Sequence, residues 1–143
     1  MHKTYQPKAG EVKRNWHLID ASESVLGRFS TQIVKLLMGK VKASYSSHMD
    51  SGDYVVVINA KKLELSGKKE FQKVYRSHSG YPGGFKETKI AKLLKESPEK
   101  VILHSVSGML PDNRLKSARL RRLKIFTDEK HPYGDKFRRE FSS

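Results

Sequence analysis

Apolar residues recur at intervals of three and four between positions 26 and 37, a spacing that places them on one face of an α-helix. Gly39 follows where a helix commonly ends in a left-handed residue, and Ser22 or Ser24 is placed to cap the helix start. The pattern therefore predicts a helix whose inward face consists of Leu26, Phe29, Ile33, Leu36 and Leu37.

The segment before this helix and the one after it both have the character of strands. "NWHLIDA" (15–21) predicts a short strand with Trp16 and Leu18 inward, and "DYVVVINA" (53–60) is apolar on both faces, as in the centre of a covered sheet. "LKIF" (123–126) predicts another short strand. A strand, a helix and a buried strand in this order indicate an α/β sandwich.

Between the buried strand and "LKIF" the pattern is mixed. "KLELSG" (62–67) and "KVYRSH" (73–78) alternate and predict strands, and a glycine-rich segment, "SHSGYPGGFK", follows the second. Apolar spacing predicts a helix over 88–96. Ser97, Pro98 and Glu99 then form a strong helix start, and a last helix is expected from Asp112 or Asn113 to about residue 122. We expect one domain over 1–126 and a basic C-terminal tail over 127–143 with too few aliphatic residues to pack well.

The charge is the first indication of function. The 143 residues include 29 Lys and Arg against 15 Asp and Glu, a net charge of +14. Such an excess opposes compaction by self-repulsion, so a polyanionic partner is expected, with nucleic acid ahead of a membrane surface or a secreted cationic role. The chain has no cysteine, which excludes disulfides and thiolate metal sites. The longest apolar run, Tyr54 to Ile58, is far shorter than the roughly 20 residues of a membrane span, and the sequence predicts a cytoplasmic protein.

Patterns typical of enzymes find little support. "GYPGG" matches neither the Walker nor the Rossmann glycine spacing. His48, Asp50 and Asp53 could coordinate a metal or form an acid–base group, but the remaining histidines show no ligand spacing, and a polar loop leading into a buried strand is the favoured interpretation. We predict no catalytic residue, no cofactor, no metal and no small-molecule substrate.

The basic residues form dense groups beside glycine-rich or turn segments and near aromatic and imidazole rings. This combination suits a structured RNA, because phosphates take the cations while unpaired bases stack on rings. Glycine pairs in addition let a backbone approach a phosphate chain closely. The predicted RNA-binding residues are Arg14, Arg28, Lys40, Lys42, Tyr45, His48, Lys68, Lys69, Lys73, Tyr75, Arg76, His78, Tyr81, Gly83, Gly84, Lys86, Arg114, Lys116, Arg119, Arg121, Arg122 and Lys124.

Several segments, in this order and spacing, match a known family. They are "KRNWHLIDA", "VLGR", "GKVKASYSSHMDSGDYVVVINA", "SGKK", "KVYRSHSGYPGG", "GMLPDN" and "RRLKIF". On these segments the chain resembles the bacterial form of large-subunit ribosomal protein thirteen up to about Lys124. The resemblance implies a three-layer α/β/α domain on a small, mostly parallel sheet. It also implies a structural, non-enzymatic role in the large ribosomal subunit, where the protein binds rRNA early in assembly beside neighbouring ribosomal proteins.

Two rival functions remain at this point: a phosphate-handling α/β enzyme that uses "SGYPGG", and a nucleoid protein that coats DNA. For the rRNA-binding function we expect the cations of 113–124 to surround their helix and pair with phosphates on several sides. Arg121 and Arg122 would then be replaceable together by glutamate without loss of the fold.

Overall fold

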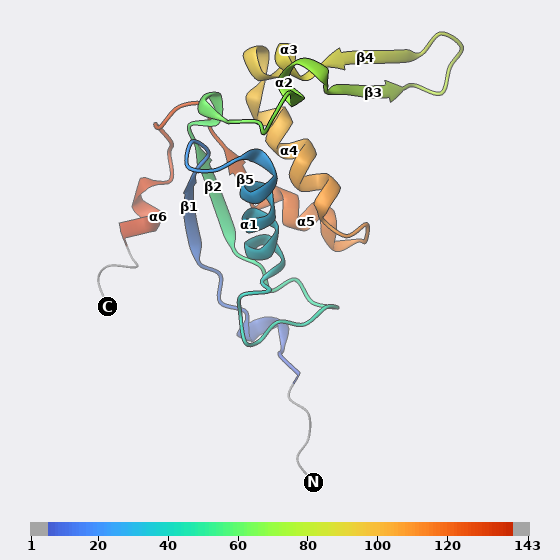
Figure 1. The fold of residues 1–143 in the computed structure, drawn as a ribbon. Coiled ribbons are helices and arrows are strands. Elements are labelled where there is room, and N and C mark those ends of the chain that lie inside the picture. Colours follow the sequence, from blue (N-terminus) through green and yellow to red (C-terminus); the bar gives the residue numbers. More distant parts are fainter. Residues whose placement is uncertain (1–5, 139–143) are drawn as a thin grey trace.

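A computed structural model describes residues 6–138. Its centre is a sheet of three parallel strands in the order β1-β2-β5, formed by β1 (Trp16–Asp20), β2 (Tyr54–Ile58) and β5 (Leu123–Ile125) (Figure 1). The predicted α/β class is confirmed, and "DYVVVINA" does supply the central strand. A parallel pair needs a crossover, and α1 (Leu26–Met38) lies in the connection between β1 and β2.

Helix α1 has the predicted apolar face and the predicted C-terminal end. Gly39 has φ of +77°, and its N–H donates to the carbonyl of Leu36. A Cβ at Gly39 would lie 2.9 Å from the Ser51 carbonyl oxygen, so glycine is required by close approach as well as by conformation. The predicted serine cap is wrong. The helix begins after Val25 without a side-chain cap, and the Ser22 hydroxyl donates to Asp20 instead.

One face of the sheet lies against the main core. Val55, Val57 and Leu123 point to this face and join the buried residues of α1 and of α4 (Pro98–Met109) in one cluster. Pro98 stands in the first turn of α4, as the sequence predicted. Leu18, predicted inward, is 46% exposed, whereas its neighbour Ile19 packs against the core, because alternate residues of a strand face opposite sides.

The other face of the sheet is covered at β1 by α6 (Gly134–Arg138). The Trp16 ring stacks on Tyr54 at 4.3 Å between ring centroids and on Tyr133 at 5.1 Å, and meets the edge of Phe137 at 6.4 Å. With α1 and α4 on one face and α6 on the other, the domain has the predicted α/β/α layers. Packing of the described part of the tail depends on aromatic rings rather than on the aliphatic residues it lacks.

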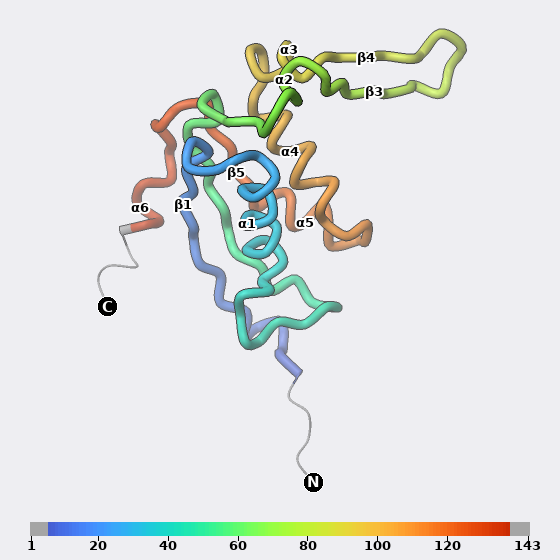
Figure 2. The backbone as a smooth tube through the Cα atoms, in the orientation of Figure 1, coloured from blue at the N-terminus to red at the C-terminus, as the bar shows by residue number. Residues whose placement is uncertain are grey.

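A two-stranded antiparallel hairpin projects from this body as a separate arm (Figures 1 and 2). It consists of β3 (Val74–His78) and β4 (Phe85–Lys89), with α2 (Lys69–Gln72) before it and α3 (Ile90–Glu96) after it. The sequence predicted β3 but missed β4, whose residues it left to the loop and to the start of the next helix.

The predicted strand "KLELSG" is also wrong. Its first residue ends a short 3-10 helix, η2 (Ala60–Lys62), and the rest is an extended connection with no pairing partner. Leu63 is buried and Leu65 packs against the core, so the alternation arises from a loop lying along the core. The described part also contains η1 (Ala9–Glu11) and α5 (Leu115–Arg121). Within residues 6–138, no helix has the length and apolarity needed to cross a membrane.

Candidate nucleic-acid interface

The glycine-rich segment forms the closed loop at the tip of the hairpin. The Ser79 N–H donates to the Gly84 carbonyl at 3.2 Å, and the Gly84 N–H donates to the Tyr81 carbonyl at 2.9 Å. Gly83 has φ of +73°, and a Cβ at Gly84 would lie 2.0 Å from the Ser79 hydroxyl oxygen. The loop therefore needs glycine at both positions for its own geometry. The loop joins two paired strands, β3 and β4, whereas an enzyme's phosphate loop joins a strand directly to a helix N-terminus.

Exposed rings gather at this tip. Tyr81 is 75% exposed, and Phe85, which is 57% exposed, lies opposite His78 across the hairpin. Two predicted cations accompany them: Lys86 is exposed, and Arg76 pairs with Glu87 across the strands at 3.3 Å. Rings and cations on an arm outside the core can reach unpaired bases and phosphates together.

Sequence reasoning missed two rings near this arm. Phe85 was not selected, nor was Phe71, which is 79% exposed in α2 between Lys69 and Lys73. Both lie in segments that contribute little to the core and stand beside lysines. That combination was visible in the sequence and could have identified them.

Other predicted residues are spread over the body rather than brought to one site. Tyr45, Lys116 and Lys124 are half-buried, and Lys116 pairs with Asp112 at 2.6 Å, while the His48 ring bonds the Ser46 hydroxyl at 2.9 Å. Eight further predicted cations are exposed: Arg14, Arg28, Lys40, Lys68, Lys69, Lys73, Arg114 and Arg121.

Arg122 corrects the prediction most clearly. It is 5% exposed, its guanidinium forms two hydrogen bonds with the Asp50 carboxylate, and it also donates to the carbonyls of Leu37 at 3.2 Å and Asp53 at 3.3 Å. One side chain thus joins the end of α1, the loop before β2 and the start of β5. The expectation that Arg122 is an outward cation is wrong, and its burial argues against replacement by glutamate without loss of the fold.

Arg119 is likewise internal. It is 1% exposed, its Nε lies 3.9 Å from the Asp50 carboxylate, and its Nε and Nη1 have no hydrogen-bond partner. The helical spacing of α5 explains both burials: Arg119 and Arg122, three residues apart, face the domain, whereas Arg121 faces solvent. The cations of this segment therefore do not all surround the helix as predicted.

Asp53 organises a second set of contacts next to the first. It accepts hydrogen bonds from the Lys42 ammonium at 2.5 Å and from the Asn15 N–H at 3.0 Å, and its other oxygen lies 3.0 Å from the His17 ring. Lys42 also donates to the carbonyls of Lys13 and Ser51. Lys42 was predicted to bind RNA, but its ammonium group is paired with groups of the protein itself.

Both carboxyl groups have lowered pKa values. Burial alone would raise the pKa of Asp50, but hydrogen bonds from Arg122 and the charges of Arg122, Arg14 and Arg119 outweigh it. Burial likewise opposes ionisation of Asp53, and hydrogen bonds from Lys42, Asn15 and His17 outweigh it, so its pKa is also lowered. Asp50, Asp53 and the cations Arg14, Lys42, Arg119 and Arg122 are called the internal charge cluster below.

This cluster decides between the alternatives for "YSSHMDSGD". The carboxylates of Asp50 and Asp53 form ion pairs with cations of the protein, and the His48 ring is hydrogen-bonded to the Ser46 hydroxyl. Among residues 6–138, no three histidine and carboxylate side chains are grouped as metal ligands. The segment is the polar loop that leads into the buried strand.

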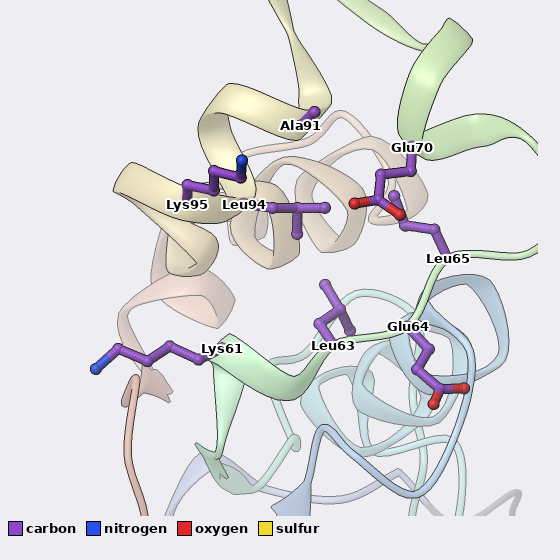
Figure 3. A pocket seen from close by; sticks show the side chains of 8 residues that line it. All are labelled: Lys61, Leu63, Glu64, Leu65, Glu70, Ala91, Leu94 and Lys95. Atoms are coloured by element: carbon purple, nitrogen blue, oxygen red, sulfur yellow. The ribbon is translucent and has the colours of Figure 1, made fainter.

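A pocket of about 380 Å³ lies between the connection after η2 and helix α3 (Figure 3). Leu63, Leu65 and Leu94 point into it, and Glu64 and Glu70 are among the residues that line it. The side chains lining it include no serine, threonine, tyrosine or histidine, and its two carboxylates are offset by Lys61 and Lys95, so its charge does not favour a phosphate.

An α/β domain that holds some of its cations inside and exposes many others, with rings on a projecting arm, is typical of a nucleic-acid-binding protein. The sequence profile of the family described as Ribosomal protein L13 matches residues 14–132. The chain is 46% identical over 132 residues to the large ribosomal subunit protein uL13 of Beutenbergia cavernae, covering 92% of this chain and 90% of the relative. It is 49% identical to the uL13 proteins of Thermoanaerobacter sp. (92% of each chain) and Chlorobium phaeobacteroides (92% of this chain, 89% of the relative).

The chain therefore belongs to the ribosomal protein L13 family. The resemblance drawn from the sequence motifs is confirmed.

Proposed function

We propose that this protein is a structural component of the large ribosomal subunit that binds large-subunit rRNA, supports early subunit assembly and catalyses no reaction. Family membership over nearly the whole chain carries the proposal, since the relatives are named large ribosomal subunit proteins. The net charge of +14 and the exposed cations support a polyanionic partner.

The proposed interface has two parts. The hairpin arm supplies rings, a glycine loop and cations for unpaired nucleotides, and the exposed cations of the body neutralise phosphates. Arg14, Lys42, Arg119 and Arg122 serve the interface indirectly, because they fix the loop of residues 40–53 against α1 and β5. The body cations of this interface are Arg28, Lys40, Lys68, Lys69, Arg114 and Arg121.

Sedimentation of a cell lysate tests the proposed function. An epitope-tagged copy should migrate with large subunits and leave those fractions after ribonuclease treatment. Migration with chromosomal DNA and release by deoxyribonuclease would support the nucleoid protein instead. Retention of the chain in the soluble, ribosome-free fractions would contradict the proposal.

Binding of the purified protein to a large-subunit rRNA transcript should weaken steeply with salt. If roughly five to ten phosphates are neutralised, log K should fall against log salt with a slope of roughly −0.7 to −0.9 per contact. A filter-binding titration at several salt concentrations measures this slope. A slope near zero would rule out the electrostatic mechanism.

Changing Gly83 and Gly84 together to alanine should weaken rRNA binding while the protein still melts in one cooperative transition. The added Cβ atoms oppose a positive φ at Gly83 and crowd Ser79 at Gly84, so the tip must rearrange, but the tip lies outside the core. Gly67→Ala is the control, because Gly67 also has positive φ, at +63°, and lies outside the hairpin. Equal rRNA affinity of the double variant and the control would make the tip an ordinary surface turn.

A further inference from the structure

A second pocket, called the corner pocket below, is lined by residues of the hairpin arm, of α3 and of α4. Figure 1 shows the hairpin leaving the body next to these helices. Its volume is about 250 Å³. Tyr75, Ser77 and Thr88 reach it from one face of the hairpin, and Lys100 and His104, one helical turn apart, reach it from α4. The hairpin arm and α4 thus both contribute side chains to the wall of this pocket.

The side chains that line this pocket combine aromatic rings with hydroxyl groups. The rings of Tyr75 and His104 meet edge to face at 4.5 Å between centroids. Burial raises the pKa of the Tyr75 phenol, which keeps its O–H as a hydrogen-bond donor. Ser77 and Thr88 add two hydroxyl groups, and none of the described residues that line the pocket carries a carboxylate.

Cations stand at this pocket with no competing acid in its lining. Lys100 and Arg76 both line it, and Arg76 is 70% exposed even though it pairs with Glu87. The pocket in Figure 3 differs, because Glu64 and Glu70 line it together with Lys61 and Lys95, which leaves its lining without net positive charge, and no aromatic ring lines it. An anionic ligand with a flat unsaturated ring therefore fits the corner pocket better than the other.

We propose that the corner pocket binds one unpaired nucleotide of RNA. The base lies against the rings of Tyr75 and His104, the hydroxyls of Ser77 and Thr88 hydrogen-bond its edge or its ribose, and Lys100 and Arg76 hold its phosphate. This inference rests on the proposed function and adds a defined nucleotide site to it. A nucleotide is favoured over a peptide because rings, hydroxyls and cations together are the groups that single-stranded RNA sites use.

Binding of a large-subunit rRNA transcript to His104→Ala, Lys100→Ala and wild type, across several salt concentrations near pH 8, tests the proposal. The variant His104→Ala removes an aromatic ring, whereas Lys100→Ala removes a permanently cationic side chain. His104→Ala should lower affinity roughly five- to a hundredfold at every salt concentration with an unchanged salt slope. Lys100→Ala should also reduce the steepness of the slope by about one phosphate contact.

Two further variants complete the design. His104→Phe keeps a ring and should retain most of the affinity lost by His104→Ala. Lys92→Ala removes the same charge from α3, outside the pocket, where Lys92 lies 3.8 Å from Glu96, and should bind more tightly than Lys100→Ala. Because His104 and Lys100 are exposed, all four variants should melt like the wild type.

The outcomes separate the inference from the proposed function. If the wild type does not bind the transcript, the proposed function fails. If the wild type binds and His104→Ala matches it, the nucleotide pocket is overturned. If His104→Ala binds RNA normally but yields subunits lacking a neighbouring protein, the pocket receives a protein segment, and the inference is again overturned.

Discussion

Arg122→Glu is expected to lower the free energy of unfolding by on the order of 3–5 kcal/mol, whereas Arg121→Glu should leave it nearly unchanged. Arg122 is buried against Asp50, so glutamate would place two carboxylates together and leave the carbonyls of Leu37 and Asp53 without their donor. Arg121, the preceding residue, is exposed. Because domains are stable by only about 5–15 kcal/mol, the Arg122 effect approaches complete unfolding.

Urea unfolding followed by circular dichroism measures both variants, which change net charge by the same amount. We expect both variants to bind rRNA poorly, but for different reasons. Arg121→Glu should bind weakly as a folded protein, and Arg122→Glu should fail because it is unfolded. Equal stabilities of the two variants would show that the internal charge cluster does not hold the domain together.

The sequence predicted the elements that have long or regular apolar patterns. The helix before Gly39, the central strand, the helix at Pro98 and the strand "LKIF" were all found where the pattern placed them. The errors fell where tertiary context decides. Leu63 and Leu65 alternate because a loop lies along the core, and β4 is polar and exposed, so its residues gave no apolar signal before the pairing with β3 was known.

The candidate site was predictable in kind but not residue by residue. Cations beside glycine and aromatic residues singled out residues 73–86 as a candidate RNA contact, and the structure places this segment on the projecting hairpin, which the sequence did not predict because β4 was missed. Arg119 and Arg122 were misassigned because their partner, Asp50, lies about seventy residues away in the chain, and no local pattern shows that separation. Asp50 was considered as part of a polar loop, or as a metal or acid–base group, but not as the partner of a cation, although the basic excess of this chain makes cations its most abundant potential partners.

Residues of the internal charge cluster therefore determine stability, and outward residues are left to determine binding. Lys42 and Arg14 hold the loop of residues 40–53 through carboxylates and carbonyls, so that Lys40, Tyr45 and His48 have fixed positions. Fixing an interface before the partner arrives reduces the entropy lost on binding. The acids of the cluster also reduce repulsion among cations that the fold brings close together.

The protein should lose stability in acid, with the loss concentrated below about pH 4, near the ordinary pKa of an aspartate. The pKa values of Asp50 and Asp53 are lowered in the folded state, so the stabilisation is complete above the unfolded-state pKa and is lost as pH falls through the lower folded-state pKa. Protonation of Asp50 removes the charge that Arg122 and Arg119 face inside the protein, and such unpaired buried charge is costly.

Asp50→Asn resembles this protonated state at every pH, which makes the prediction specific to one residue. The variant should be several kcal/mol less stable than the wild type near neutral pH, and this difference should narrow by up to about 1.4 kcal/mol per pH unit as the pH falls below about 4. Asp128→Asn is the matched control: Asp128 pairs with Lys61 at 2.9 Å but is 64% exposed, so solvent and salt screen the pair. Urea unfolding of all three proteins from pH 7 to pH 3 gives the curves. Parallel curves for Asp50→Asn and wild type would mean that Asp50 does not cause the acid sensitivity, and that the buried arginines are compensated by other groups.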